Sequence, residues 1–117
     1  MHERSLVKAL LRQVEDVAAE HPGSHVVSIR VRIGEFSGVE PELLASAYDD
    51  LVTDTPLCGA ALDLEQVPLE AFCKQCGSQF RIKRFNFQCD ICGSMNITIR
   101  GGEEMLLDSV TLEESEL

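Results

Sequence analysis

Two short stretches, Cys73-Lys-Gln-Cys76-Gly77-Ser78 and Cys89-Asp-Ile-Cys92-Gly93-Ser94, organise the middle of this chain. Each is a Cys-x-x-Cys pair followed by Gly-Ser, and twelve residues separate the two pairs. A tight turn lets both sulfurs of a pair point at one ion, and the glycine lets the backbone fold back beneath it. Two such knuckles joined by a hairpin predict a tetrahedral site of four sulfurs, Cys73, Cys76, Cys89 and Cys92, of the kind that zinc prefers.

Other uses of the same four cysteines are two disulfides, a thioredoxin-like redox pair and an iron–sulfur cluster. Disulfides belong to oxidising compartments, and no secretory signal precedes the cysteines. Two pairs at this spacing argue against a redox pair, and iron–sulfur clusters typically use other spacings. Because all four protein ligands are thiolates, no position stays open for a substrate or water, so we interpret the predicted zinc as structural.

The charge of the chain is strongly and unevenly negative. Its 117 residues carry 20 acidic and 10 basic side chains, for a net charge of −10. Residues 73–97 alone carry +3, which leaves −13 for the rest. An acidic body of this kind disfavours nucleic-acid binding and suits docking on basic proteins or attracting cations. No apolar run approaches the ~20 residues that span a bilayer, so we expect a cytoplasmic protein without a membrane partner.

Hydrophobic periodicity outlines the elements around the cysteines. Apolar residues at helical spacing predict two helices, and alternating residues predict strands. Ser5 is the expected N-cap of the first helix, and Pro41 is expected in the first turn of the second. The last strand is expected to bury Leu106, Val110 and Leu112. The predicted helices are residues 5–20 and 41–52, and the predicted strands are 27–33, 61–67, 96–100 and 104–112.

These elements predict an α+β fold, an α/β-type sandwich in which two helices pack on a small, mixed, three-stranded sheet. A strand–helix–strand unit at residues 27–67 favours one parallel pair. We expect an α/β domain from residues 1–70 plus 101–117, and an inserted zinc-ribbon-like hairpin domain with the four cysteines at residues 71–100. Gly101-Gly102 is interpreted as a hinge. The insert needs metal, because its expected core is small: Phe72, Phe80, Ile82, Phe85, Phe87 and Ile91.

The first three residues, Met1-His2-Glu3, form a second candidate metal site. The ring and backbone nitrogens of His2 and the amine of Met1 can close fused chelate rings on one ion. Glu3 can add a backbone nitrogen or its carboxylate. Nitrogen donors in a plane favour Cu(II) or Ni(II), although a histidine at a chain end is more often simply exposed.

Taken together, these features resemble the HypA/HybF family, the nickel-insertion accessory proteins of nickel–iron hydrogenase maturation. The resemblance is carried by Met-His-Glu, by Gly34-Glu35-Phe36-Ser37-Gly38-Val39-Glu40, by the two cysteine pairs and by Gly101-Gly-Glu-Glu. It runs essentially from end to end. It implies a nickel metallochaperone that binds Ni(II) through Met1, His2 and Glu3 and holds structural Zn(II) with the four cysteines. Glu40 matches an acidic residue that some members use near the start of the second helix.

The resemblance also implies partners: the maturation GTPase HypB, a hydrogenase large-subunit precursor and, in some bacteria, urease accessory proteins. It leaves monomer and dimer open. A competing hypothesis is a zinc-ribbon module that binds nucleic acid or protein, since phenylalanines of the insert could stack on bases. We find no nucleophile–base pair and no phosphate loop, and therefore expect no enzymatic activity.

Overall fold

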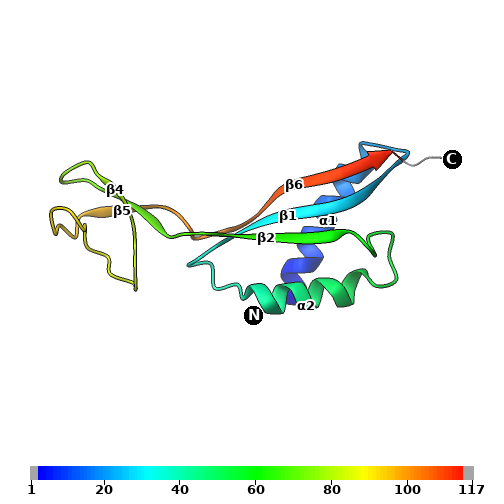
Figure 1. Ribbon diagram of the computed structural model, residues 1–117, viewed down its shortest axis with the longest axis horizontal. Helices are drawn as coiled ribbons and strands as arrows, with labels where there is room; N and C mark the ends of the chain where they lie inside the picture. The colour runs from blue at the N-terminus through cyan, green and yellow to red at the C-terminus, as the bar shows by residue number, and fades with distance from the viewer. Residues whose placement is uncertain (1–2, 115–117) are drawn as a thin grey trace.

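The computed structural model describes residues 3–114, which form an elongated molecule of 61 × 26 × 16 Å. Figure 1 shows a body of two helices and three strands at one end and the cysteine-bearing insert at the other. The elements follow the predicted order along the chain. They are α1 (Glu3–Ala19), β1 (Ser24–Gly34), α2 (Pro41–Val52), β2 (Ala61–Val67), β3 (Glu70–Cys73), β4 (Gln79–Arg81), β5 (Ile97–Gly101) and β6 (Met105–Glu114).

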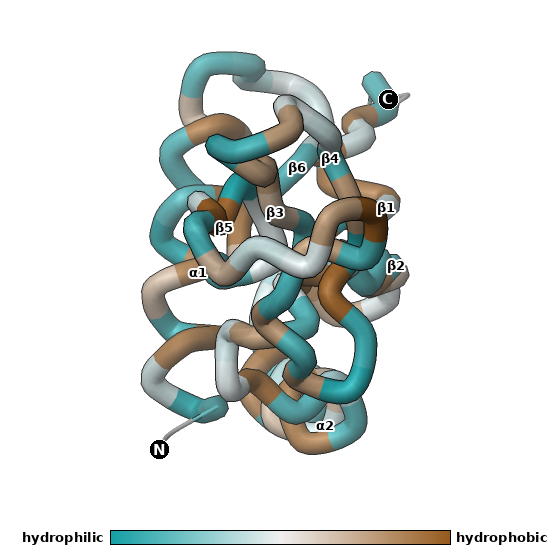
Figure 2. The backbone as a smooth tube through the Cα atoms, turned by 90° about the vertical axis from the view of Figure 1, so that its left-hand side faces the viewer, coloured by the Kyte–Doolittle hydropathy of each residue, from teal (hydrophilic) through white to brown (hydrophobic). Residues whose placement is uncertain are grey.

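The body contains a mixed sheet in the order β2-β1-β6. β1 pairs in parallel with β2, and antiparallel with β6. The α+β architecture and the parallel strand–helix–strand unit are therefore confirmed. Both helices cover the same face of the sheet, and apolar and polar segments alternate along them in Figure 2. Their buried residues form one core with β1: Val7, Leu10 and Val14 of α1, Leu44, Ala47, Tyr48 and Val52 of α2, and Ile29, Val31 and Ile33.

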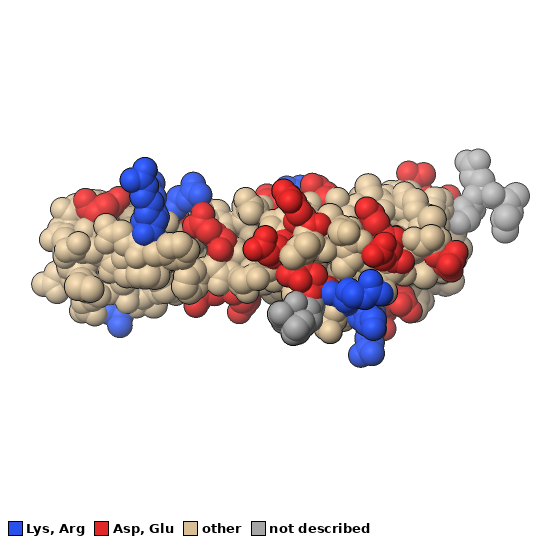
Figure 3. All heavy atoms as spheres, turned by 90° about the horizontal axis from the view of Figure 1, so that it is seen from below, with Lys and Arg blue, Asp and Glu red and all other residues tan. Residues whose placement is uncertain are grey.

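The other face of this sheet is open and charged. Arg30 lies 2.9 Å from Glu65 and 3.9 Å from both Asp63 and Asp108, so it bridges all three strands. Seen from below, acidic side chains gather over the body together with one group of basic ones, and further basic side chains stand on the insert (Figure 3). The uneven charge of the sequence thus becomes a difference between the two ends of the molecule.

The prediction that β6 buries Leu106 is wrong. Arg30 pairs with Ser109 but Val31 pairs with Leu107, so Asp108 is an extra residue in β6. A bulge of this kind moves the residues before it to the opposite face. Met105 and Leu107 consequently pack against the core, together with Val110 and Leu112, while Leu106 is exposed.

The start of the first helix also differs from the prediction. α1 begins at Glu3, two residues early, so Ser5 lies in the first turn instead of capping it. The position before Glu3 is His2, which lies outside the described residues. In α2, Pro41 occupies the first turn as predicted, and Glu40 holds the N-cap position without a side-chain capping bond.

The insert has its own antiparallel sheet, β4-β3-β5, and its own small core. That core consists of Leu69, Ala71, Cys73, Phe80, Ile82 and Cys89. The expectation that Phe85, Phe87 and Ile91 also belong to it is wrong, because all three are exposed. The two phenylalanines instead contact a ring from the body, that of Phe36.

The body and the insert meet where three segments cross. The amide of Glu35 donates to Val67 O, and that of Phe36 donates to Gly102 O, at 2.8 and 2.7 Å. Gly102 has a φ of +92°, and a Cβ there would lie 2.6 Å from Leu69 Cα. Close approach of three backbones is therefore sufficient to explain this glycine.

Candidate metal centre

The two knuckles of the insert repeat one backbone pattern. Cys73 N donates to Ser78 O at 2.8 Å, and Cys89 N donates to Ser94 O at the same distance. Gly77 and Gly93 donate back to the carbonyls of the two cysteines at 2.9 and 3.0 Å. Both glycines have a positive φ, 78° and 77°, which an L-residue adopts only with strain. The repeated Gly-Ser is thus explained by the turn that each knuckle makes.

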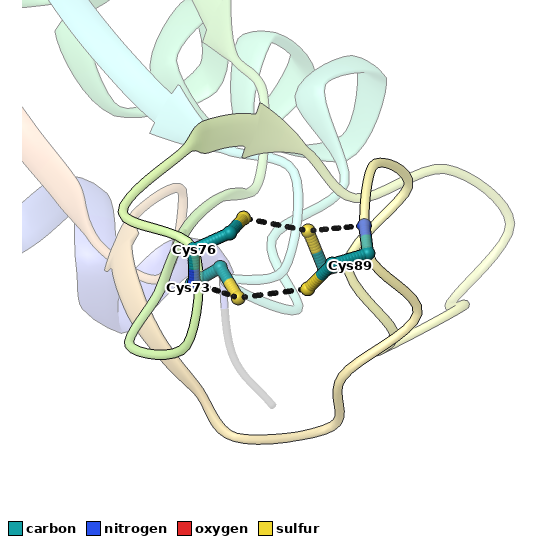
Figure 4. Close-up of side chains that lie close together, drawn as sticks. Cys73, Cys76 and Cys89 are labelled. Carbon is teal, nitrogen blue, oxygen red and sulfur yellow. Dashed lines mark hydrogen bonds between the residues drawn. The ribbon is translucent and has the colours of Figure 1, made fainter.

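The knuckles bring all four sulfurs together. Cys73, Cys76, Cys89 and Cys92 offer ligand atoms that lie within 4.8 Å of one another. The Sγ atoms of Cys73 and Cys92 are 3.6 Å apart. Those of Cys76 and Cys89 are 3.7 Å apart, and a dashed line joins these two labelled residues in Figure 4. A tetrahedral ion with Zn–S bonds of about 2.3 Å holds its sulfurs about 3.8 Å apart. The sulfur positions fit such an ion.

Backbone amides point at the sulfurs as well. Cys76 N lies 3.5 Å from Cys73 Sγ, and the amides of Ile91 and Cys92 lie 3.4 and 3.5 Å from Cys89 Sγ. Such donors stabilise thiolates over thiols. Cys73 and Cys89 are buried, whereas Cys76 and Cys92 are exposed, so water reaches one side of the site.

Four sulfurs this close do not ionise equally without a cation. Hydrogen bonds from the side chain and backbone of Ser78 lower the pKa of Cys76 to about 6. A backbone hydrogen bond from Ser94 favours the Cys92 thiolate, but burial and the three neighbouring sulfurs outweigh it and raise the pKa of Cys92 to about 12. Holding four thiolates together requires a positive charge at their centre, which is what a divalent ion would supply.

The geometry excludes the disulfide alternative for the described cysteines. All five are free, and the sulfur separations far exceed the about 2.05 Å of a disulfide bond. Cys58 lies away from the cluster in the loop between α2 and β2. It is exposed, although a free cysteine is more often buried.

Of the predicted nickel ligands, Met1 and His2 lie outside the described residues. Glu3 lines a hollow of about 590 Å³ between α1, the loop before α2 and the start of β6. Val39 lines the same hollow, whereas its neighbour Glu40, the other predicted carboxylate, is not one of the lining residues. Glu103 and Glu104 also line it. The sequence alone does not indicate their place at this site, because only the return of β6 beside β1 carries them there.

Comparison with known proteins decides the family. Residues 1–112 match the family model described as "HypA: Hydrogenase/urease nickel incorporation, metallochaperone, hypA". The chain belongs to the HypA family. A hydrogenase maturation factor HypA from Nitrosospira multiformis is 41% identical over 112 residues, which cover 96% of this chain and 97% of that protein. The HypA of Aquifex aeolicus is 39% identical, with 97% of this chain and 98% of that protein covered.

Solved structures agree with the HypA assignment. The solution structure of the nickel metallochaperone HypA from Helicobacter pylori is 30% identical, with a TM-score of 0.68 over 99% of this chain and 100% of that one. A second structure, described as the solution structure of HypA protein, has a TM-score of 0.72 and 30% identity over 97% of both chains. The resemblance found in the sequence is thus confirmed. Within residues 3–114, no helix is long and apolar enough to cross a membrane.

Proposed function

We propose that this HypA-family chain is a cytoplasmic nickel metallochaperone, not an enzyme, that delivers Ni(II) during maturation of nickel–iron hydrogenase. The match of residues 1–112 to a nickel-incorporation family carries this proposal. The family description also names urease, so a urease apoprotein is a second client to test. The expected partners are the GTPase HypB, the hydrogenase large-subunit precursor and urease accessory proteins.

In this proposal nickel is cargo, bound by the amine of Met1, the ring and backbone nitrogens of His2, and Glu3. Glu40 is the candidate for an additional carboxylate. The carboxylates of Glu3, Glu103 and Glu104 around the hollow beside α1 support the proposal, since they would attract a cation to this end of the body. Release would be favoured by protonation, because amine and backbone nitrogens bind metal only after losing a proton.

In the same proposal, Cys73, Cys76, Cys89 and Cys92 hold zinc and take no part in delivery. Zinc bound there would neutralise four thiolates and tie the two knuckles together. The protein supplies the rest: amides that favour the thiolate form, glycines that permit the turns, and a small core beneath the site. The fit of the sulfur separations to a tetrahedral ion supports zinc as the resident metal.

The metal stoichiometry of the untagged protein tests both the nickel and the zinc part of the proposal. We expect one nickel and one zinc per chain in the wild type. The variant His2→Ala, or extra residues before Met1, should abolish nickel binding and leave zinc in place. His21→Ala removes another exposed histidine and is the matched control, which should keep its nickel. Nickel that survives both changes at the N-terminus would overturn the ligand assignment.

A further inference from the structure

An aromatic cluster lies between the insert and the body. Phe36, in the loop after β1, packs against Phe85 with ring centroids 5.6 Å apart and against Phe87 at 6.2 Å. The rings stay largely in water: their exposed fractions are 47% for Phe36, 66% for Phe85 and 37% for Phe87. A group of exposed rings such as this is typical of a surface that contacts another molecule.

The backbone that presents Phe85 is strained. Arg84 and Phe85 have φ values of 54° and 57°, and Asn86 N donates to Lys83 O at 3.0 Å. Two positive φ values inside such a bond describe a type I′ turn, which favours Asn-Gly. An L-residue adopts this conformation only with strain. The chain nevertheless places an arginine and a phenylalanine there, and strain of this kind gathers at functional positions.

Beside the rings lie two positively charged side chains, Lys83 and Arg84. Within the described part of the chain neither Lys83 nor Arg84 forms an ion pair, whereas Arg30, Arg32 and Arg81 all do. Both line a hollow of about 440 Å³ whose walls also include Glu35, Arg81, Phe85 and Leu69. Arg81 is paired with Glu35. Two cations without an ion pair and one aromatic ring therefore line this hollow.

We propose that this surface, formed by Phe36, Phe85 and Phe87 with Lys83 and Arg84, docks an acidic segment of a partner protein. Carboxylates of that segment would pair with the two free cations, and its aliphatic or aromatic side chains would cover the rings. Nucleic acid fits less well, because the acidic body next to the insert repels phosphate. The inference rests on the proposed function in one respect: the partner is sought among the proteins of nickel-enzyme maturation.

The test measures binding of the full-length, zinc-loaded protein to two purified probes, the HypB GTPase and the hydrogenase large-subunit precursor of the same organism. Phe85→Asn removes the ring but keeps a residue that tolerates positive φ. The double variant Lys83→Ser with Arg84→Asn removes the charges and keeps the turn. Leu43→Gln, a change at an exposed apolar residue on α2, is the matched control. Zinc content and thermal unfolding establish that each variant is folded.

We expect both surface variants to weaken binding to at least one probe by about tenfold or more, as for residues that dominate an interface. Leu43→Gln should stay within about twofold of the wild type. Raising sodium chloride to about 0.5 M should weaken the wild type far more than the double variant, because salt screens only the charge contribution. Unchanged affinity of both surface variants for both probes would overturn the inference.

A photo-cross-linker at position 85, p-benzoylphenylalanine, identifies the occupant in a mixture with both probes. Cross-links to a segment rich in Asp and Glu support the inference. Cross-links to a second copy of this chain, or to added RNA, overturn it. Nickel binding measured on the same samples distinguishes the docking surface from the proposed function. A variant that loses docking but still binds nickel supports the docking surface. A wild-type protein that binds no nickel contradicts the proposed function.

Discussion

The carboxylate of Glu35 joins the body to the insert through Arg81, whose Nη2 donates to Glu35 Oε2 at 3.3 Å. The other carboxylate oxygen accepts from Leu69 N at 3.2 Å, in the two-residue link between β2 and β3 that leads into the insert. The hydrogen bond from Leu69, and the bond and positive charge of Arg81, hold the pKa of Glu35 below its ordinary value of 4.5 despite partial burial. One side chain of the body thus binds two separate positions of the insert.

The lowered pKa of Glu35 predicts how stability depends on pH. A carboxylate whose pKa is depressed by folding contributes stability that is present above its ordinary value of 4.5. That contribution is lost as pH falls through the lowered pKa. We expect the difference in unfolding free energy between wild type and Glu35→Gln to be constant from about pH 7 to 5 and to shrink below that range.

Denaturant unfolding at a series of pH values measures this difference. Zinc loss at acid pH affects both proteins alike and largely cancels in the comparison. Arg81→Gln removes the other partner of this ion pair and is the matched variant. It should lose only part of the stability that Glu35→Gln loses, because Leu69 N still donates to the carboxylate. A difference that grew toward low pH would show that Glu35 is not stabilised as a carboxylate.

The crossing of backbones at Gly102 predicts opposite outcomes for neighbouring glycines. Gly102→Ala would place a methyl group 2.6 Å from Leu69 Cα and Pro68 O, in a residue with a φ of +92°. We expect a loss of about 2–5 kcal/mol, from about 1–2 for the left-handed conformation and about 1–3 for overpacking. Gly101→Ala, where a Cβ meets nothing within 4 Å, is the control. Thermal or denaturant unfolding compares the two.

If instead Gly101-Gly102 served as a flexible hinge, both alanine variants would restrict it. They would then change domain motion to a similar degree and cost little stability. Equal and small losses in the two variants would therefore favour the hinge that the sequence suggested. A large loss confined to Gly102→Ala would establish the packed crossing.

Much of this fold follows from local patterns. The mixed sheet was predictable because Ile29, Val31 and Ile33 alternate along one strand and the connection through α2 favours a parallel neighbour. The sulfur cluster was predictable because spacing alone brings two Cys-x-x-Cys pairs to one point. The sulfur cluster depends on cysteines close in sequence, and the parallel pair depends on the strand–helix–strand connection, which has few exceptions.

Long-range geometry explains the errors at Leu106, Phe85 and Phe87. Leu106 was placed in the core because the alternation of apolar and polar residues was assumed to continue through the whole strand, whereas the strand has a bulge at Asp108. Phe85 and Phe87 were placed inside the insert because phenylalanine is usually buried, and their partner Phe36 lies about fifty positions earlier in the chain. Glu103 and Glu104 were missed at the hollow beside Glu3 for the same reason.

The buried hydroxyl of Tyr48 predicts a stability loss that is easy to measure. It donates to Ala60 O at 2.8 Å and ties α2 to the start of β2. Tyr48→Phe would leave that carbonyl without its partner, so we expect a loss of about 1–3 kcal/mol in denaturant unfolding. Burial, and then the nearby Asp49 and Cys58, raise the pKa of Tyr48 above 10.0. Because this is the only tyrosine, ultraviolet titration should show a midpoint above that value.

Removing zinc should unfold the insert and spare the body. The insert core has six buried residues, two of which are the ligands Cys73 and Cys89, so little apolar packing remains without metal. Structural zinc contributes about 10–16 kcal/mol in zinc-finger peptides, far more than such a core can replace. For Cys89→Ser we expect no bound zinc and loss of amide protection across residues 70–101. Hydrogen exchange should still find β1, α1 and α2 protected, since their core is separate.

Cys58→Ser, at the exposed cysteine outside the cluster, should bind zinc and exchange like the wild type. Persistent protection of β3 and β5 in the zinc-free variant would mean that the insert folds on its apolar residues and that the four thiolates serve another purpose.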